Sequence, residues 1–260
     1  MRAMVFCAGA GSRLRPLTRL LPKPLVAVGR LPMAVRVLLA LRRAGIREAV
    51  LNLAHGADAV PAALGTGEAL GMRLFYSREG STAEEALETR GGLVRAMDLL
   101  TDNGRYEHFI AVAGDIVSDY DFFRLTERAR CWEADPACAP AAHLVLVPNP
   151  AYHPQGDMAL APEGAVSREG AGERLTFASI GLYRADAFAG LPDGRSPLFP
   201  WLWEKRLTGE KFVGPWANVG DPAELTAARS RWTGDAGDAA RLGVGPDEWT
   251  NLLRTYGARG

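Results

Sequence analysis

The chain has 260 residues, of which 48% are hydrophobic and 23% are charged. This composition is typical of a globular protein, with enough chain for one large domain and a short appendage. Lysine and arginine together number 30, as do aspartate and glutamate, so the formal net charge is zero. A neutral chain has no general attraction for nucleic acid or for an anionic membrane, so any anion site must be built locally.

Cysteine and histidine are too scattered to indicate a disulfide scaffold or a zinc site. The three cysteines are Cys7, Cys131 and Cys138, an odd number without regular spacing. The apolar run at the N-terminus is too short for a signal peptide, and no stretch approaches the ~20 apolar residues of a membrane span. We therefore expect a cytoplasmic protein that binds neither membranes nor nucleic acid.

Apolar runs alternate with helical patterns in the first part of the chain. Buried strands are predicted at residues 3–8, 49–53, 72–76, 109–113 and 144–147. Helices are predicted between them, at residues 32–42, 57–64, 91–100 and 121–134. This alternation predicts a Rossmann-like α/β fold, in which a mostly parallel sheet is flanked by helices.

The pattern changes in the second part of the chain. Residues 156–183 contain short strands and turns, which we interpret as a small antiparallel insertion. Beyond it, the sequence predicts helices at residues 197–207 and 223–232, short strands within residues 212–219, and a weak helical stretch at residues 247–253. We predict a main domain over residues 1–232, followed by a C-terminal appendage of unassigned role over residues 233–260.

A segment rich in glycine and arginine follows the first predicted strand. Gly9 and Gly11 allow backbone N–H groups to approach an anion closely. Three cations lie within fifteen residues of these glycines, namely Arg13, Arg15 and Lys23. The segment therefore predicts a phosphate-binding loop.

Two better-known phosphate loops are excluded by the residues present. A Walker A loop needs Gly-x-x-x-x-Gly-Lys-Ser/Thr, which is absent. A dinucleotide fingerprint needs a third glycine, where this chain has Leu14, and a carboxylate after the second strand, where residues 52–55 supply none. An ordinary turn with surface arginines is disfavoured by the prolines on both sides of Lys23, because they stiffen the segment that would clamp a phosphate.

Residues 6–18, followed by Pro22-Lys23-Pro24-Leu25, resemble the signature of the sugar nucleotidyltransferases. The resemblance implies the GT-A-like fold of nucleotide-diphospho-sugar transferases. It also implies that Arg13 and Lys23 are catalytic cations and that Lys23 bridges toward the phosphates. The loop residues that would hold the nucleoside triphosphate are Ala8, Gly9, Gly11, Ser12 and Arg13.

Later segments resemble the N-acetylmuramate-1-phosphate uridylyltransferases of peptidoglycan recycling, in order, up to about residue 229. These segments are residues 76–80, 87–92, 114–122, 146–157 and 216–220. The resemblance implies that residues 1–147 mainly bind the nucleotide and residues 148–232 mainly bind the sugar. The implied base-binding residues are Glu79, Gly80, Thr89 and Gly91. The implied sugar-binding residues are Asn149, Gly156, Asp157 and Ser179.

Asp115 resembles the family's metal-binding aspartate, and its position also has a physical reason. It follows a predicted buried strand, at the edge where open α/β sheets place ligands, and a carboxylate there suits Mg²⁺. Taken alone, Asp115 could equally be a turn or cap residue, and we prefer that simpler interpretation for Asp119 and Asp121. Asn149, which stands between two prolines, could also be only a turn residue.

Two positions depart from the family pattern. Asn218 stands where the family commonly has a second metal-binding aspartate, so it offers Mg²⁺ a carbonyl oxygen without a negative charge. Arg90 stands where the family often has glycine, and we expect it either to add a cation near the nucleotide or to crowd the base pocket. Neither position belongs to the phosphate loop, so the enzyme interpretation is kept.

The implied reaction joins UTP and a sugar 1-phosphate, in particular N-acetylmuramate α-1-phosphate, to give a UDP-sugar and pyrophosphate. The nucleophile is a phosphate oxygen that needs no general base, so positioning and charge neutralisation must supply most of the rate. A guanylyl- or thymidylyltransferase acting on mannose, heptose or glucose 1-phosphate is an alternative within the same class. A catalytically weak nucleotide-sugar sensor is an alternative of another class, and the sequence leaves the oligomeric state open.

Overall fold

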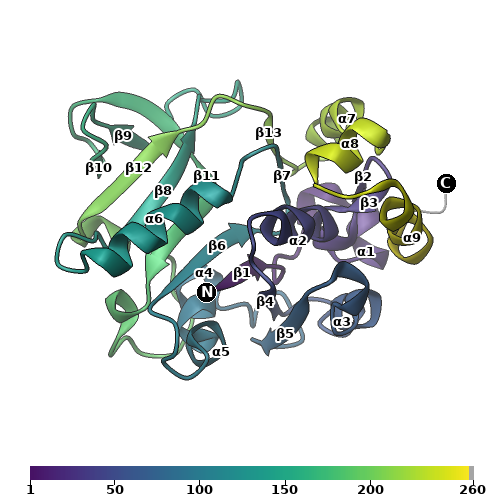
Figure 1. The fold of residues 1–260 in the computed structure, drawn as a ribbon, viewed down its shortest axis with the longest axis horizontal. Coiled ribbons are helices and arrows are strands. Elements are labelled where there is room, and N and C mark those ends of the chain that lie inside the picture. Colours follow the sequence, from purple (N-terminus) through teal and green to yellow (C-terminus); the bar gives the residue numbers. More distant parts are fainter. Residues whose placement is uncertain (258–260) are drawn as a thin grey trace.

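The computed structural model describes residues 1–257, and the first strands of the chain form the parallel half of its main sheet (Figure 1). These strands are β1 (Arg2–Phe6), β4 (Glu48–Leu53), β5 (Arg73–Arg78) and β6 (His108–Ala113). β1 lies between β4 and β6, and β4 pairs in turn with β5. The last residue of β1, Phe6, is in register with Asn52 of β4 and Ala113 of β6. The loops that follow these strands therefore leave the sheet on the same side, at the carboxyl ends of the parallel strands.

The other half of the sheet is mostly antiparallel. β11 (Glu173–Arg184) pairs antiparallel with β6 on one side and with β8 (Ala142–Val147) on the other. β12 (Leu207–Lys211) adds to β8 in parallel, while β9 (Met158–Leu160) and β10 (Val166–Ser167) extend the sheet beside the start of β11. The predicted antiparallel insertion is confirmed, but its last strand is long and separates β6 from β8 in the main sheet.

Hydrophobic cores lie on both faces of the sheet, because successive strand residues point to opposite sides. Ala3 of β1 packs into one core with α2 (Met33–Arg43) and α6 (Phe123–Ala134). Its neighbour Met4 packs into the other core with α5 (Met97–Thr101). Strands covered on both faces have continuous apolar sequences, which is the pattern that predicted them. The predicted α/β fold, a mostly parallel sheet flanked by helices, is confirmed.

Short elements connect these strands and helices. They are η1 (Ser12–Leu14), α1 (Leu17–Leu20), η2 (Lys23–Leu25), β2 (Ala27–Val28), β3 (Leu31–Pro32), α3 (Ala59–Leu64), η3 (Glu68–Leu70), β7 (Ile116–Ser118), η4 (Asp186–Phe188) and β13 (Trp216–Asn218). β2 pairs with β3, and β7 pairs with β13, each as a small antiparallel sheet. β7 follows β6 after Gly114 and Asp115, so the second of these small sheets lies next to Asp115.

Two predicted helices differ from the observed ones. The predicted helix at residues 91–100 is divided into α4 (Glu88–Arg95) and α5. The predicted helix at residues 197–207 is only a 3₁₀ turn, η5 (Trp201–Glu204). Pro200 lacks the N–H of a helical hydrogen bond and biases the residue before it toward extended backbone, so the apolar pattern alone overestimated this helix.

The end of the described chain lies on the side of the molecule that holds the parallel strands, next to α1 and α2 (Figure 1). α7 (Pro222–Arg231) is followed by α8 (Ala236–Arg241) and α9 (Pro246–Tyr256). α9 packs against β3 and η3, and Trp249 and Leu252 place its apolar side in the same core as α2. The sequence predicted one weak helix in this region, whereas residues 233–257 contain both α8 and α9.

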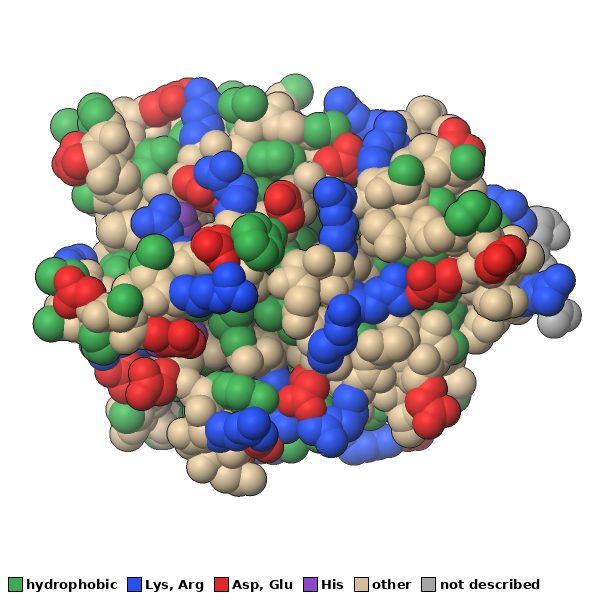
Figure 2. Space-filling view, in the orientation of Figure 1, with side chains coloured by type: hydrophobic (Ala, Val, Ile, Leu, Met, Phe, Trp, Pro, Cys, Tyr) green, Lys and Arg blue, Asp and Glu red, His purple; other side chains and the backbone are tan. Residues whose placement is uncertain are grey.

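None of the helices within residues 1–257 is long and apolar enough to cross a membrane. On the face shown in Figure 2, basic and acidic side chains are interspersed rather than gathered into a patch of one sign. This distribution agrees with the zero net charge of the sequence.

Candidate active site

Two adjoining cavities open at the edge of the sheet where the parallel strands end. The smaller cavity has a volume of about 280 Å³ and the larger one of about 960 Å³. Phe6 and Thr89 line both cavities, so the two cavities lie side by side. The other residues that line the smaller cavity are Ala8, Gly9, Asn52, Glu79, Ala86, Glu88 and Arg195.

The predicted phosphate loop leaves β1 and turns at Gly11. Gly11 has a φ of +61°, and a Cβ atom there would lie 2.9 Å from Thr18 Cγ2 and 3.0 Å from Lys23 Cβ. The Thr18 hydroxyl donates a 2.7 Å hydrogen bond to the Gly11 carbonyl oxygen. At Gly9, by contrast, a Cβ atom would have no neighbour within 4 Å, so the backbone there faces open space. The turn therefore leaves the loop backbone accessible and brings Lys23 against it.

The ammonium group of Lys23 forms an ion pair with the carboxylate of Asp115. Lys23 begins η2 between two buried prolines, and Asp115 follows β6 after one intervening glycine. The side chains are 11% and 23% exposed, so solvent screens their charges only in part. The structure thus joins a predicted catalytic cation to a predicted metal ligand across 92 positions of sequence.

Asn218 lies beside this ion pair. β13 pairs with β7 so that Asn218 is opposite Ile116, and the Val219 N–H donates to the Asp115 carbonyl oxygen at 3.1 Å. The Asn218 Oδ1 atom is buried and has no hydrogen-bond partner in the described part of the chain. A buried carbonyl oxygen without a partner is unusual and needs an explanation.

These two oxygen donors fit a Mg²⁺ ion that is shared with substrate phosphates. Mg²⁺ takes oxygen ligands and is commonly held by one or two carboxylates together with phosphate oxygens. Asp115 would provide a carboxylate oxygen, and Asn218 would provide the amide oxygen that has no partner. Within residues 1–257, no three His, Cys, Asp or Glu side chains are grouped as a metal site, so the substrate would have to complete the ligand set.

The Asn218→Asp variant is expected to need less Mg²⁺ for activity than the wild type. A second carboxylate should lower the Mg²⁺ concentration for half-maximal turnover by roughly threefold to tenfold, because ligand charge tunes the affinity of oxygen sites. The measurement is a Mg²⁺ titration of pyrophosphate release, with Asn251→Asp on the exposed side of α9 as the matched control. An unchanged titration midpoint in Asn218→Asp would show that this side chain is not a ligand.

Arg13 approaches the same region from the other end of the phosphate loop. Its side chain is exposed, and a Cβ atom on Gly220 would lie 2.9 Å from Arg13 Nη2. The same position would be 2.9 Å from Glu224 Oε2, which accepts from the N–H groups of Gly220 and Asp221 at the start of α7. Arg13 therefore lies next to the residues that follow Asn218, and Ser12 is exposed beside it.

A chain of hydrogen bonds fixes one wall of the smaller cavity. The Cys7 N–H donates to Asn52 Oδ1 at 2.7 Å, and Asn52 Nδ2 donates to Glu79 Oε1 at 2.7 Å. The Leu87 N–H donates to Glu79 Oε2 at 2.8 Å. Burial raises the pKa of the Glu79 carboxyl above its ordinary value, although both hydrogen bonds act in the opposite direction. Glu79 thus lines the cavity, and both of its carboxylate oxygens accept hydrogen bonds. The sequence analysis did not identify the contact with Asn52.

The other predicted base-binding residues have two different environments. Thr89 lines both cavities. Gly80 and Gly91 instead pack against other parts of the chain, where a Cβ atom would collide with Glu85 and with the Gly194 carbonyl oxygen, respectively. Their lack of a side chain therefore allows these close approaches.

The side chain of Arg90 is held by contacts with Ser196 and Trp201. Its Nε donates a 3.0 Å hydrogen bond to Ser196 Oγ, and its guanidinium lies over the ring of Trp201, 5.8 Å from the centroid. The residues that line the two cavities, as far as the described chain shows, do not include Arg90. The structure therefore shows neither of the two expected arrangements, because Ser196 and Trp201 hold this side chain.

Ser179 and Asp157 line the larger cavity. Ser179 lies where the register of β11 shifts between Phe177 and Gly181, and its φ is +57°. A positive φ is uncommon for a residue with a side chain, and such strained residues and bulges occur often at functional sites. Asp157 accepts a 2.8 Å hydrogen bond from the Phe177 N–H through Oδ2, and its Oδ1 lies 3.0 Å from His153 Nε2.

Asn149 and Gly156 support this cavity without lining it. Asn149 Nδ2 donates to the carbonyl oxygens of Pro154 and Arg174, each at 3.1 Å, and its Oδ1 accepts from Thr176 Oγ1 at 2.9 Å. Gly156 has a φ of +61°, and a Cβ atom there would collide with Asn149 Oδ1. The side chain of Asn149 therefore organises a turn, which is the simpler of the two roles considered for it.

Two features of the larger cavity involve residues outside the predicted binding set. Phe177, Phe199 and Trp203 form an aromatic wall, with ring centroids 6.0 Å apart in the first pair and 4.6 Å apart in the second. Arg168 lines the cavity, and in the described chain no other lysine or arginine does so. It also lies at the surface, where its Nε is 3.6 Å from Glu169. An arginine in a polar hairpin carries no sequence signal that separates it from an ordinary surface residue.

This arrangement suits an enzyme that brings a nucleoside triphosphate and a second phosphorylated substrate together. The model of the nucleotidyl transferase family matches residues 2–148, and the chain belongs to that family. The predicted nucleotidyltransferase enzyme is therefore confirmed. The roles of the individual site residues stay predictions.

The chain is similar to two uridylyltransferases over most of its length. It is 36% identical to the N-acetylmuramate alpha-1-phosphate uridylyltransferase of Neisseria meningitidis serogroup B, over 88% of this chain and 97% of that protein. It is 32% identical to the enzyme of the same name from Caulobacter vibrioides, over 88% of this chain and 96% of that protein. A Bacillus anthracis structure assigned as a glucose-1-phosphate thymidylyltransferase shares the fold, with a TM-score of 0.75 and 18% identity over 94% of this chain and all of that one.

Proposed function

We propose that this enzyme transfers UMP from UTP to N-acetylmuramate α-1-phosphate, giving a UDP-sugar and pyrophosphate in peptidoglycan recycling. The observation that carries the proposal is the contact of Lys23 with Asp115 at the phosphate loop. Gly9 of this loop lines the smaller cavity, and Asn218, beside Asp115, lines the larger one. The names of the two similar uridylyltransferases support the base and the acceptor. Mg²⁺ as the cofactor and a cytoplasmic location belong to the same proposal.

The two cavities divide the substrates between them. In the proposal, the smaller cavity receives the base and ribose of UTP, and the larger one receives the sugar. The nucleotide is held by Ala8, Gly9, Gly11, Ser12, Arg13, Glu79 and Thr89, with Gly80 and Gly91 allowing Glu85 and Gly194 to approach closely. The sugar is held by Asp157 and Ser179, with Asn149 and Gly156 supporting the turn around them.

The proposed reaction is a substitution at the α-phosphorus of UTP. An oxygen of the sugar phosphate forms a bond to this phosphorus, and the bond from the phosphorus to the bridging oxygen of the β-phosphate breaks. Pyrophosphate leaves with the electron pair of the broken bond. The second ionisation of a phosphate ester has a pKa of ~6, so the nucleophile is already an anion and no general base is needed. The remaining difficulty is the repulsion between two polyanions that must meet in line.

Fixed cations reduce this repulsion. The Asp115 carboxylate holds Lys23 in place until the phosphate oxygens of the substrates compete for its ammonium group. Lys23 then draws the sugar phosphate toward the α-phosphorus, while Arg13 stabilises negative charge that develops on the transferred and leaving phosphates. Mg²⁺, held by Asp115 and Asn218, would supply further charge neutralisation at the phosphates.

The larger cavity is suited to an acceptor that carries a substituent. N-acetylmuramate differs from N-acetylglucosamine by a lactyl ether, which has one methyl group and one carboxylate. The aromatic wall of Phe177, Phe199 and Trp203 offers apolar surface to the sugar ring and to the methyl group. Arg168 offers the carboxylate a guanidinium, which binds carboxylates in a planar, two-pronged geometry.

The Arg168→Gln variant is expected to lose affinity for the carboxylate-bearing sugar alone. Its KM for N-acetylmuramate α-1-phosphate should rise by about fivefold to tenfold, because a partly exposed hydrogen bond to a charged group contributes ~1–1.5 kcal/mol. Kinetics with N-acetylglucosamine 1-phosphate should be unchanged, and Arg130→Gln on the exposed side of α6 is the matched control. Equal losses with both sugars would exclude carboxylate recognition by Arg168. A wild-type preference for N-acetylglucosamine 1-phosphate would overturn the proposed acceptor itself.

A further inference from the structure

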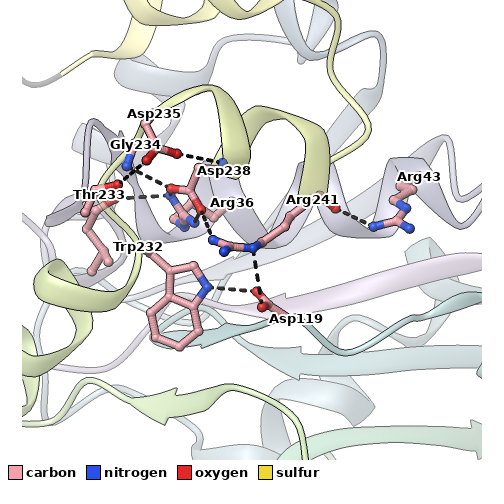
Figure 3. Close-up of polar contacts among 10 residues, drawn as sticks. Arg36, Arg43, Asp119, Trp232, Thr233, Gly234, Asp235, Asp238 and Arg241 are labelled. Carbon is pink, nitrogen blue, oxygen red and sulfur yellow. Dashed lines mark hydrogen bonds and ion pairs between the residues drawn. The ribbon is translucent and has the colours of Figure 1, made fainter.

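The C-terminal segment, residues 232–257, is joined to the rest of the molecule by buried polar contacts. Asp238 of α8 is 0% exposed and binds both terminal nitrogens of Arg36 on α2, each at 2.8 Å (Figure 3). Arg36 itself is only 4% exposed. Asp238 also accepts a 3.0 Å hydrogen bond from the Gly234 N–H. This buried, two-pronged ion pair fixes α8 on α2 in one orientation. Loss of either partner would leave the other as an unpaired buried charge, which is costly.

The same segment contacts the chain directly after β7. Trp232 Nε1 donates a 2.8 Å hydrogen bond to Asp119 Oδ1, and Arg241 Nε lies 3.8 Å from Asp119 Oδ2 (Figure 3). The Asp119 N–H in turn donates to the Pro215 carbonyl oxygen at 2.9 Å, just before β13 begins. Asp119 therefore connects the C-terminal segment to the strand pair β7–β13, which carries Asn218 and begins after Asp115.

A second set of contacts reaches the chain after Lys23. β2 follows η2, and its Val28 carbonyl oxygen accepts a 3.3 Å hydrogen bond from Arg36. Gly29 has a φ of +62°, and a Cβ atom there would collide with the Trp232 carbonyl oxygen, so the two segments pack backbone to backbone. The C-terminal segment is thus fixed both to the hairpin that follows Lys23 and to the strand pair that follows Asp115.

We propose that the C-terminal segment positions the catalytic groups by joining these two parts of the site. Asp119 is then a positioning residue that holds β7 and β13 in register, rather than a simple turn residue. Trp232 and the ion pair of Arg36 with Asp238 hold Asp119 and the β2–β3 hairpin against one another. The inference rests on the proposed function only for the roles of Lys23, Asp115 and Asn218.

The Trp232→Phe variant tests this inference, because it removes the hydrogen bond to Asp119 and keeps an aromatic ring in the core. Hydrogen exchange of the substrate-free protein should be faster in peptides that cover residues 115–121 and 215–220. The Mg²⁺ concentration for half-maximal turnover should rise by about threefold to fivefold. This is less than the ~10-fold or more that loss of a partner of a metal ligand costs, because Trp232 acts on the proposed ligands only through Asp119. Turnover at saturating Mg²⁺ should stay close to that of the wild type.

The Glu248→Gln variant is the matched control, since it breaks the ion pair of α9 with Arg42 and does not touch Asp119. It should change neither the exchange of the two peptides nor the Mg²⁺ midpoint. Arg241→Gln should also speed exchange in the two peptides and raise the Mg²⁺ midpoint, but by less than Trp232→Phe. Because Arg241 is exposed, this variant still tests the inference if Trp232→Phe does not fold. Unchanged exchange in Trp232→Phe and Arg241→Gln, or equal shifts in Glu248→Gln, would overturn the positioning role. Exchange is measured without substrate, so it decides this question even if no substrate pair gives turnover.

Discussion

Replacement of Lys23 by alanine is expected to lower kcat by about 10²-fold or more, the usual cost of deleting a fixed charge that stabilises a transition state. The physical reason is local. The ammonium group is held against the Asp115 carboxylate by a short segment with a proline on each side, so little reorganisation is needed before it meets a phosphate. Without it, the repulsion between the two substrates has to be overcome by the remaining cations.

Steady-state pyrophosphate release at saturating substrates and Mg²⁺ measures this effect. The matched control is Arg19→Ala, which removes an exposed cation from α1, close in sequence to Lys23. Arg19→Ala should behave as the wild type. Near-normal kcat in Lys23→Ala would show that the lysine only stabilises Asp115, and the catalytic assignment would be withdrawn.

The second large effect is expected for Asp115→Asn, which should lose roughly 10²-fold or more of the Mg²⁺-dependent activity. The variant keeps the size of the side chain but removes its charge, so Lys23 loses its ion pair and the proposed Mg²⁺ site keeps only amide oxygens. Both consequences weaken the same step, because the site then has fewer fixed charges around the phosphates.

A Mg²⁺ titration of Asp115→Asn separates this account from a loss of folding. The matched control is Asp121→Asn, because an asparagine can still accept the 3.2 Å hydrogen bond that Asp121 receives from the Phe123 N–H at the start of α6. The control should show wild-type turnover and the wild-type midpoint. Retained activity with an unchanged Mg²⁺ dependence in Asp115→Asn would place the metal elsewhere in the protein.

The fold and the glycine turn after β1 could be predicted because their signals are local. A run such as residues 3–8 is apolar throughout because both faces of β1 are covered, and the glycine and proline pattern up to residue 25 reflects backbone geometry that few other residues adopt. The position of β11 between β6 and β8 could not be predicted in this way. Strand order depends on packing between distant segments, and no single run of sequence contains it.

The same distinction explains which site residues the sequence analysis described well. Thr89 and Ser179 line cavities, and their binding roles stay predictions. Gly91 is small because Gly194, about a hundred positions later, packs against it, and Asn149 is engaged by Arg174 and Thr176 on another strand. Contacts of this kind are decided by tertiary structure, so a motif can mark the position correctly without revealing what the residue touches.

Pyrophosphate release with Mg²⁺, measured over a grid of nucleoside triphosphates and sugar 1-phosphates, tests the central claim most directly. We expect release with UTP and N-acetylmuramate α-1-phosphate, and much less with GTP or dTTP or with mannose, heptose or glucose 1-phosphate. Release with another pair would keep the mechanism and replace the acceptor or the base. The absence of release with every pair, in a protein that binds nucleotide, would contradict the enzyme account and favour a nucleotide-sugar sensor.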